Sequence, residues 1–299
     1  MNMFSQVLDC RGRELVLDRP RIAGIVNVTT DSFSDGGRFL DPDAAVAHAL
    51  QLVEEGADLL DIGAESTRPG ASSVPAAVQI ERIVPVIEAL ATRTSIPISV
   101  DTSEPGVMRA ALMAGAGMIN DARALRVEGA LEAVAESSAV VCLMHMQGEP
   151  RAMQDAPYYD DVVGEVHRFL SDRVLACQFA GIDKKRIVVD PGFGFGKTLE
   201  HNLLLLAQLE RFAEIAPVMA GLSRKSMIAG LTGQTGVDRR IHGSVAAALI
   251  AAQRGAAVVR VHDVAATRDA LRVWQGVAAL PAHARKARPA SNPGPWDDD

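Results

Sequence analysis

Short apolar runs rich in β-branched residues recur along the chain, and each is followed by a polar or glycine-rich segment and then by a helical stretch. This alternation predicts parallel strands joined by helical crossovers. Most of the runs are apolar at every position, which is typical of strands covered on both faces. The predicted strands are residues 22–28, 59–63, 96–100, 118–120, 139–145, 187–190, 218–222 and 258–261. The predicted helices are residues 44–55, 78–93, 107–114, 129–137, 162–180, 201–211, 243–253 and 265–277.

Eight strand–helix units within about 260 residues predict the α/β class and a (β/α)8 TIM barrel. An open doubly wound sheet is the alternative, but its GxGxxG motif is absent after residues 22–28. The first 20 residues are predicted to form a β-hairpin across the barrel floor, with its turn at residues 10–13. Residues 1–280 are thus predicted to be a single barrel domain, and the proline-rich residues 281–299 a disordered tail.

The composition of the 299-residue chain narrows the possible partners and the compartment. With 30 basic and 37 acidic residues the net charge is −7, which argues against a general nucleic-acid or anionic-membrane binder because both need a broad positive field. No apolar run approaches the roughly 20 residues that span a bilayer, and the N-terminus lacks the apolar core of a signal peptide. Cys10, Cys142 and Cys177 form no CxxC pair and no disulfide framework. We therefore expect a reduced, cytoplasmic protein.

Nearly every predicted strand ends in residues able to do chemistry. In a TIM barrel these strand ends and the loops after them form the active site. Each residue alone has a structural alternative, because Asp or Asn at a strand end often caps the next helix. Eight such ends around one rim instead predict one polar site. The strand-end residues include Asn27, Asp31, Asp61, Glu65, Asp101, Asn120, Asp121, His145, Asp190, Ser223, Arg224, Lys225, Arg260 and His262.

The glycine-rich segment 192–198 ends in Gly-Lys-Thr, like a phosphate-binding P-loop. It does not match that motif, because Pro191 occupies the position of the required first glycine. Two interpretations stay open: a loop that presents Phe195 to a flat substrate, and a plain turn with a packed aromatic ring.

Metal and nucleophile motifs limit the chemistry further. The histidines and cysteines lack zinc-ligand spacing, and His145, which lies between two methionines, is interpreted as structural. The oxygens of Asn27 and Asp31 suit Mg²⁺, which takes one or two protein groups together with substrate phosphates. The chain has no Gly-x-Ser-x-Gly elbow that would indicate a nucleophilic serine.

Taken together, these segments resemble the dihydropteroate synthase family of pterin-binding TIM barrels. The combination of Ser-Thr-Arg-Pro-Gly, Ser-Arg-Lys-Ser and Arg-Val-His-Asp is not expected in relatives that bind methyltetrahydrofolate. The chain departs from the family pattern at Thr30, where proline is usual, and at residues 122–124, where an apolar residue is usual. The matching stretches follow the family order and are residues 27–37, 65–71, 99–103, 119–121, 143–148, 190–197, 223–226 and 260–263.

The resemblance implies a transferase of folate biosynthesis that joins 6-hydroxymethyl-7,8-dihydropterin diphosphate to p-aminobenzoate, giving 7,8-dihydropteroate and pyrophosphate. It implies a dissociative displacement with Asp101, Asp190 and Lys225 as catalytic residues, and Mg²⁺ held by Asn27 and Asp31. The implied pterin ligands are Asp101, Asn120, Met144, Asp190 and Lys225. The implied diphosphate ligands are Asn27, Thr67, Arg260 and His262. The implied p-aminobenzoate ligands are Phe33, Thr67, Arg68, Pro69, Phe195, Lys225 and Ser226.

The chemistry of these residues is consistent with the implied substrates. Arg260 and His262 lie two positions apart on one strand, so they face the same side and can meet one anion. The family also implies a homodimer and inhibition by sulfonamides that compete with p-aminobenzoate. Two alternatives remain: a methyltetrahydrofolate–corrinoid methyltransferase relative, and a non-catalytic pterin-binding paralogue.

Overall fold

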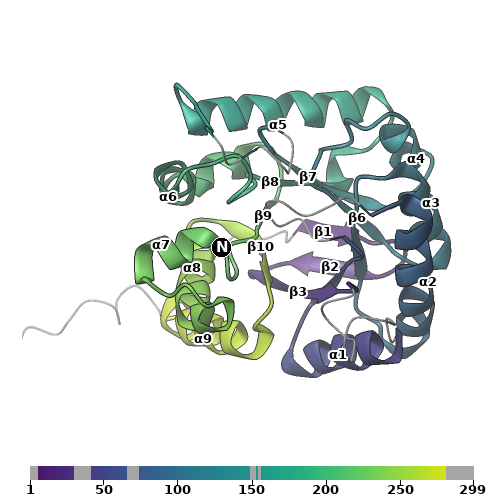
Figure 1. Cartoon of the computed structure of the whole chain (residues 1–299), viewed down its shortest axis with the longest axis horizontal. Helices are drawn as coiled ribbons and strands as arrows, with labels where there is room; N and C mark the ends of the chain where they lie inside the picture. The colour runs from purple at the N-terminus through teal and green to yellow at the C-terminus, as the bar shows by residue number, and fades with distance from the viewer. Residues whose placement is uncertain (1–5, 30–41, 66–73, 149–152, 154–155, 281–299) are drawn as a thin grey trace, which may run out of the picture.

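Eight parallel strands form a closed barrel in the computed structural model, which describes residues 6–29, 42–65, 74–148, 153 and 156–280. The strands are β3 (Arg21–Asn27), β4 (Leu59–Gly63), β5 (Ile98–Asp101), β6 (Met118–Asp121), β7 (Val140–Met144), β8 (Ile187–Asp190), β9 (Val218–Ala220) and β10 (Ala256–Val261). Their order around the barrel is β10-β3-β4-β5-β6-β7-β8-β9, so each strand pairs with its neighbour in sequence and β10 closes on β3 (Figure 1). The predicted TIM barrel is confirmed.

Helices follow the strands and cover the outside of the barrel, as Figure 1 shows. Buried aliphatic side chains fill the layer between the helices and the strands. None of the helices in the described part of the chain is long and apolar enough to cross a membrane. The α-helices are α1 (Pro42–Glu55), α2 (Ala76–Arg93), α3 (Pro105–Ala114), α4 (Ala130–Ala135), α5 (Val162–Phe179), α6 (Leu199–Ala207), α7 (Ser226–Thr232), α8 (Ile241–Gln253) and α9 (Val264–Ala278). The 3-10 helices are η1 (Lys184–Arg186), η2 (Leu209–Glu214) and η3 (Val237–Arg240).

The structure corrects the predicted elements in three places. The predicted helix 201–211 is two elements, α6 and η2, which are separated at Gln208. The predicted strand 96–100 begins only at Ile98, after Pro97, whose nitrogen has no proton to donate to a ladder. The short helix α7 was not predicted, because its seven residues are too few to show a clear helical period.

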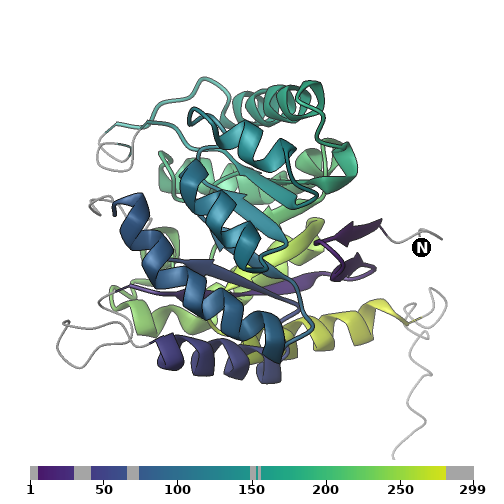
Figure 2. The same ribbon diagram turned by 90° about the vertical axis from the view of Figure 1, so that its right-hand side faces the viewer.

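The N-terminal hairpin closes one end of the barrel, as predicted. Strands β1 (Gln6–Asp9) and β2 (Glu14–Leu17) pair antiparallel around a turn at residues 10–13. Figure 2 shows this purple hairpin against the end of the barrel where the strands begin. Leu8, Cys10 and Leu15 pack there against side chains from the barrel interior. The approach is so close that a Cβ at Gly117 would overlap the carbonyl oxygen of Cys10, so the hairpin covers the barrel interior at this end.

Strand register places the predicted polar residues at that opposite end. Asn27 is level with Gly63, which is level with Asp101, and Asp101 is level with Asn120. Farther around the barrel, Met144 is level with Asp190. Because each of these positions is the last or next-to-last residue of its strand, their side chains start from one rim. The predicted tail, residues 281–299, lies outside the described residues.

Candidate active site

A narrow cavity lies at the C-terminal ends of the barrel strands, where the sequence predicts the site. Its volume is about 20 Å³, enough for roughly one water molecule. Arg260 on β10 crosses the barrel end to reach carboxylates on β4 and β5, so protein side chains occupy much of the space. The lining residues are Asp101, Asn120, Ala122, Met144, Asp190, Phe195, Gly221, Lys225 and Arg260. Apart from Ala122 and Gly221, all of them were predicted site residues.

Arg260 joins two carboxylates that come from different strands. Its Nε lies 2.5 Å from Asp61 Oδ2, and its Nη2 lies 2.8 Å from Asp101 Oδ2. Asp61 is completely buried and also accepts a hydrogen bond from the Asn120 amide at 3.0 Å. Its second oxygen, Oδ1, is buried without a hydrogen-bond partner. Charge-assisted bonds of this kind are among the strongest that side chains make, so the cluster is a rigid part of the cavity wall.

The protonation of this cluster is governed by burial. Burial raises the pKa of Asp101 to about 7, and the Arg260 guanidinium opposes that shift while the carboxylates of Asp61 and Asp121 add to it. Burial alone would lower the pKa of Arg260, but the adjacent carboxylates of Asp61 and Asp101 raise it above its usual value. Arg260 therefore stays charged, and Asp101 changes charge near neutral pH.

Asp190 and Lys225 form the opposite wall together with Phe195. Asp190 Oδ1 accepts a 2.7 Å hydrogen bond from the Gly192 amide, while burial raises the pKa of this carboxyl. Lys225 Nζ donates to the Phe193 carbonyl oxygen at 2.6 Å and lies 3.9 Å from the centroid of the Phe195 ring. Burial lowers the pKa of Lys225 to about 7, which the Asp190 carboxylate opposes. A lysine over an aromatic face gains a cation–π attraction while it is charged.

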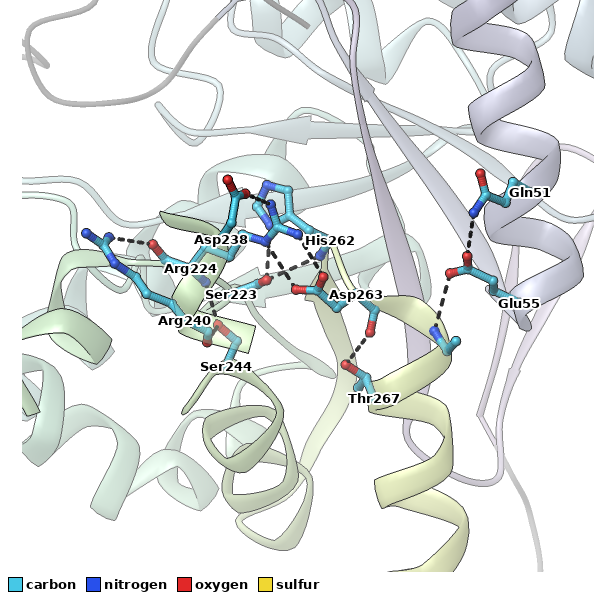
Figure 3. A network of polar contacts seen from close by, with 11 residues as sticks. Gln51, Glu55, Ser223, Arg224, Asp238, Arg240, Ser244, His262, Asp263 and Thr267 are labelled. Carbon is cyan, nitrogen blue, oxygen red and sulfur yellow. Dashed lines mark hydrogen bonds and ion pairs between the residues drawn. The ribbon is translucent and has the colours of Figure 1, made fainter. Parts of the chain in front are cut away.

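A polar network fixes the turn that carries Lys225. Arg224, the preceding residue, has a φ of 59°, a left-handed conformation that is costly for a side chain with a Cβ. Figure 3 shows Arg224 making two bonds to Asp263, of 2.7 and 3.1 Å, and donating its backbone N–H to Ser244 Oγ. Ser223 Oγ lies 3.0 Å from His262 Nδ1, which links the end of β9 to the end of β10. These bonds hold the strained turn and the imidazole of His262 in place.

A larger cavity, of about 280 Å³, lies away from this site. It is bounded by the start of β3, the turn before β4 and the last turns of α9, at the end of the barrel where the strands begin. Its lining contains none of the predicted site residues. We therefore place the candidate active site in the smaller cavity, because that cavity collects the buried charged groups.

Comparisons with known proteins identify the family. A family described as pterin binding enzyme matches residues 23–262. The dihydropteroate synthase of Escherichia coli (strain K12) is 49% identical over 274 residues, which cover 91% of this chain and 95% of the relative. The chain belongs to the dihydropteroate synthase family.

Solved structures of family members have the same fold. The dihydropteroate synthase of Xanthomonas albilineans with 4-aminobenzoic acid has a TM-score of 0.89 and 61% identity, covering 93% of this chain and 100% of that one. The same enzyme with 7,8-dihydropteroate has a TM-score of 0.84 and 58% identity, covering 92% of this chain and 100% of that one. The Yersinia pestis enzyme with a sulfonamide drug has a TM-score of 0.87 and 47% identity, and the match covers 92% of this chain and 100% of that one.

Three further predicted residues of this family member are described by the structure but do not line the cavity. Asn27 ends β3, Ser226 begins α7, and His262 follows β10. Arg260 contacts two carboxylates in this structure, so its binding of a diphosphate stays a prediction. Asp31, Phe33, Thr67, Arg68 and Pro69 lie outside the described residues.

Asp61 is one of the polar strand-end residues of the sequence, but no function was predicted for it. Asp61 contacts both Arg260 and Asn120, and so it connects residues from three strands. The sequence contains a signal for this role, because a charged residue within the apolar run Leu59–Gly63 needs a buried partner of opposite charge or a hydrogen-bond donor. No role was predicted for Arg224 and Asp263 either, and their ion pair joins the turn before Lys225 to the residue that follows His262.

The donor chemistry of Asn27 fits Mg²⁺. Its amide oxygen is a hard ligand, and Mg²⁺ needs few protein groups when substrate phosphates and water complete its coordination. Within the described ranges, no group of three or more His, Cys, Asp or Glu side chains is arranged to hold a metal ion. A metal held by Asn27 and Asp31 would take further ligands from substrate phosphates and water.

Proposed function

We propose that this chain joins 6-hydroxymethyl-7,8-dihydropterin diphosphate to p-aminobenzoate and releases 7,8-dihydropteroate and pyrophosphate. The observation that carries the proposal is one cavity that brings the buried Asn120 and Asp190 and the partly buried Asp101 together with Lys225 and Arg260. The family relationship supports it, because the related Xanthomonas albilineans enzyme was crystallised with 7,8-dihydropteroate.

The pterin ring is recognised along one edge, which carries hydrogen-bond donors and acceptors. The carboxylates of Asp101 and Asp190 accept from its N–H groups, and the amide of Asn120 can both donate and accept. A buried group left without a partner costs about 1–3 kcal/mol, so a ring that lacks this edge is disfavoured. Because Arg260 contacts Asp101 and the cavity is narrow, the ring enters as these side chains move apart.

The reaction is dissociative. The C–O bond to the diphosphate breaks first, and its electron pair leaves with pyrophosphate. The carboxylates of Asp101 and Asp190 stabilise the pterin cation that remains. The amine nitrogen of p-aminobenzoate then forms the C–N bond and loses one proton. No protein nucleophile takes part, so the side chains contribute binding, orientation and charge.

The diphosphate needs positive charge at the same rim. Arg260 and His262 extend from the end of β10, and Asn27 ends the adjacent strand β3. One unit-charge contact at about 4 Å contributes about 4 kcal/mol before desolvation if the effective dielectric constant is about 20. Bound Mg²⁺ would neutralise charge on the diphosphate and make pyrophosphate a better leaving group; Asn27 and Asp31 would hold it.

Turnover by the purified chain tests the function directly. We expect the chain, Mg²⁺, the pterin diphosphate and labelled p-aminobenzoate to give labelled dihydropteroate and an equal amount of pyrophosphate. Removal of Mg²⁺ with a chelator should stop turnover, and added Mg²⁺ should restore it. Methyl transfer from methyltetrahydrofolate to a corrinoid protein would overturn the proposal, and so would pterin binding without any product.

We infer that sulfonamides compete with p-aminobenzoate. The supporting observation is the relationship to the Yersinia pestis enzyme, which was crystallised with a sulfonamide drug. A sulfonamide should raise the KM for p-aminobenzoate without changing kcat. An inhibition pattern that lowers kcat alone would exclude competition.

We propose that the chain forms a homodimer through the adjoining surfaces of α6, α7 and α8, which Figure 1 shows as neighbours. These helices carry exposed aliphatic side chains, and exposed apolar surface of this kind suits a protein–protein interface. Light scattering should give twice the monomer mass, and Leu231→Glu should give the monomer; a monomeric wild-type chain would refute the dimer. The exposed side chains are Leu199, Leu203, Leu204, Leu231 and Ile250.

We also propose a cytoplasmic location. All three cysteines are buried free thiols, as suits a reducing compartment. Burial raises the pKa of Cys10 to about 12 and that of Cys177 to about 11, so neither thiol is reactive. Fractionation of the source cells should recover the activity with cytoplasmic markers, and recovery with another compartment would refute the location.

A further inference from the structure

The glycine-rich segment 192–198 contains a buried lysine that the proposed reaction does not use. Lys197 is 3% exposed and is separate from the side chains that line the cavity. Its Nζ donates to the Phe195 carbonyl oxygen at 3.0 Å and lies 2.9 Å from His145 Nδ1. The His145 carbonyl oxygen is a third, longer acceptor at 3.4 Å. Each of the three ammonium protons therefore has an acceptor, and one of these is the backbone of Phe195.

His145 is an acceptor for Lys197 because its imidazole is neutral. Burial lowers the pKa of His145 to about 2, and the charge of Lys197 lowers it further. The ring is also fixed in place, since it packs edge-on against Phe169 at a centroid distance of 4.8 Å. Its backbone N–H donates to the Asp190 carbonyl oxygen at 3.0 Å. His145 thus presents a fixed acceptor to Lys197, which agrees with its interpretation as structural.

The loop before Lys197 packs directly on the end of β7. A Cβ at Gly192 would overlap the His145 carbonyl oxygen, and a Cβ at Gly196 would overlap the Gln147 carbonyl oxygen. Both glycines also have positive φ, 72° and 62°. Tyr159 adds a 2.9 Å hydrogen bond from its hydroxyl to the Gly196 carbonyl oxygen. The glycines therefore permit the loop to lie close to the end of β7, and Lys197 and Tyr159 stabilise it there by hydrogen bonds to its carbonyl oxygens.

The other side of this loop forms the cavity wall. The Phe195 ring lines the cavity and lies under Lys225 Nζ, at 3.9 Å. Phe193 supplies the carbonyl oxygen that Lys225 contacts. A shift of the Phe195 backbone would move the ring relative to Lys225. Displacements of about 1 Å in such a site can lower rates by about 100-fold.

We propose that Lys197 is a positioning residue for dihydropteroate synthesis: with His145 it fixes the carbonyl of Phe195 and thereby holds the Phe195 ring beneath Lys225. The proposal rests on the proposed function and deepens it. It gives the Gly-Lys-Thr sequence a role different from phosphate binding, since Lys197 donates all its bonds to the protein.

A double-mutant cycle with Phe195 tests the proposal. Lys197→Met keeps the length of the side chain but removes its donors, and Phe195→Ala removes the ring that Lys197 is said to position. We expect Lys197→Met to lower kcat/KM about tenfold or more in the wild-type background. In the Phe195→Ala background the same change should alter kcat/KM by less than about twofold, because the shared target is gone. Should Lys197→Met fail to fold, Lys197→Gln takes its place in the cycle.

Leu205→Ala, in the core beneath α6, is the matched control. It should lower the melting temperature because it leaves a cavity in the core, and its kcat/KM should match that of the wild type. Equal losses from Lys197→Met in both backgrounds would overturn the proposal, because they would indicate general destabilisation. Unchanged kcat/KM in Lys197→Met would also overturn it. A wild-type chain without turnover would refute the proposed function itself, whereas an active wild type with additive losses refutes only the role of Lys197.

Discussion

Replacing Arg260 by methionine removes the cation between two buried carboxylates. Met keeps an unbranched apolar stem, so the change deletes chiefly the guanidinium that contacts Asp61 at 2.5 Å and Asp101 at 2.8 Å. Removing one partner of a buried ion pair destabilises by about 3–5 kcal/mol, because the other charge stays buried and unpaired. Asp61 is fully buried, so water cannot replace the guanidinium easily. We expect Arg260→Met to lower the free energy of unfolding by about 3–5 kcal/mol at pH 8.

The loss should be smaller at pH 6 than at pH 8. The pKa of Asp101 is raised by burial to about 7 in the wild type, and Arg260 is the main group that opposes the shift. Without Arg260 the folded-state pKa rises further above the unfolded value. A carboxyl with a raised pKa binds more protons in the folded state, so it destabilises the protein increasingly as pH rises through that pKa. At pH 6 Asp101 takes up a proton, which removes one of the two unpaired charges.

Urea unfolding followed by circular dichroism at pH 6 and pH 8 measures both effects. Arg254→Met is the matched control, because Arg254 pairs with Glu210 at 3.4 Å with both side chains about half exposed. Exposed pairs contribute about 0–1 kcal/mol, so the control should change little at either pH. A loss for Arg260→Met as small as that of the control would refute the reasoning. So would a large loss that is equal at the two pH values.

The remaining predictions concern binding and backbone geometry. Asp101→Asn should weaken pterin binding in calorimetry by about tenfold or more without changing the circular dichroism spectrum; unchanged affinity would contradict edge pairing. Asn120→Leu should cost about 1–3 kcal/mol of pterin affinity, and no loss would exclude its amide as a ligand. Gly192→Ala should lower the melting temperature because its Cβ would overlap the His145 carbonyl. Gly276→Ala, with open space around it in α9, should instead stabilise by about 0.5–1 kcal/mol; equal melting temperatures would refute this contrast.

The barrel and most of the site could be predicted from the sequence because both depend on local pattern. Each apolar run ends at a polar residue, and the chain order of the runs is also their order around the barrel. Asp101, Asn120 and Asp190 could therefore be placed at one rim from their positions alone. Lys225 followed from the same argument, since it comes soon after β9.

The partners of Arg260 could not be predicted in the same way. Asp61 and Arg260 are separated by 199 positions and lie on β4 and β10, which are not adjacent in the barrel. Their contact depends on closure of the barrel and on side chains that cross its end. The left-handed backbone conformation of Arg224 could not be predicted either, because it is stabilised by Ser244 and Asp263 from distant segments. The local sequence pattern predicts at which strand end a side chain lies, whereas its contacts depend on how distant segments pack.

The charge balance at the barrel end explains why an acidic chain can present so many buried ions there. Four carboxylates at or beside the cavity face three cations, so the unliganded site carries no excess of positive charge when all of them are ionised. An incoming diphosphate adds several negative charges, which raises the cost of binding unless a further cation accompanies it. This argument favours a requirement for Mg²⁺ with the diphosphate and not with the bare pterin. Calorimetry should therefore find Mg²⁺-dependent affinity for the diphosphate alone, and equal Mg²⁺ dependence for both ligands would contradict it. The acidic groups are Asp61, Asp101, Asp121 and Asp190, and the cations are Lys197, Lys225 and Arg260.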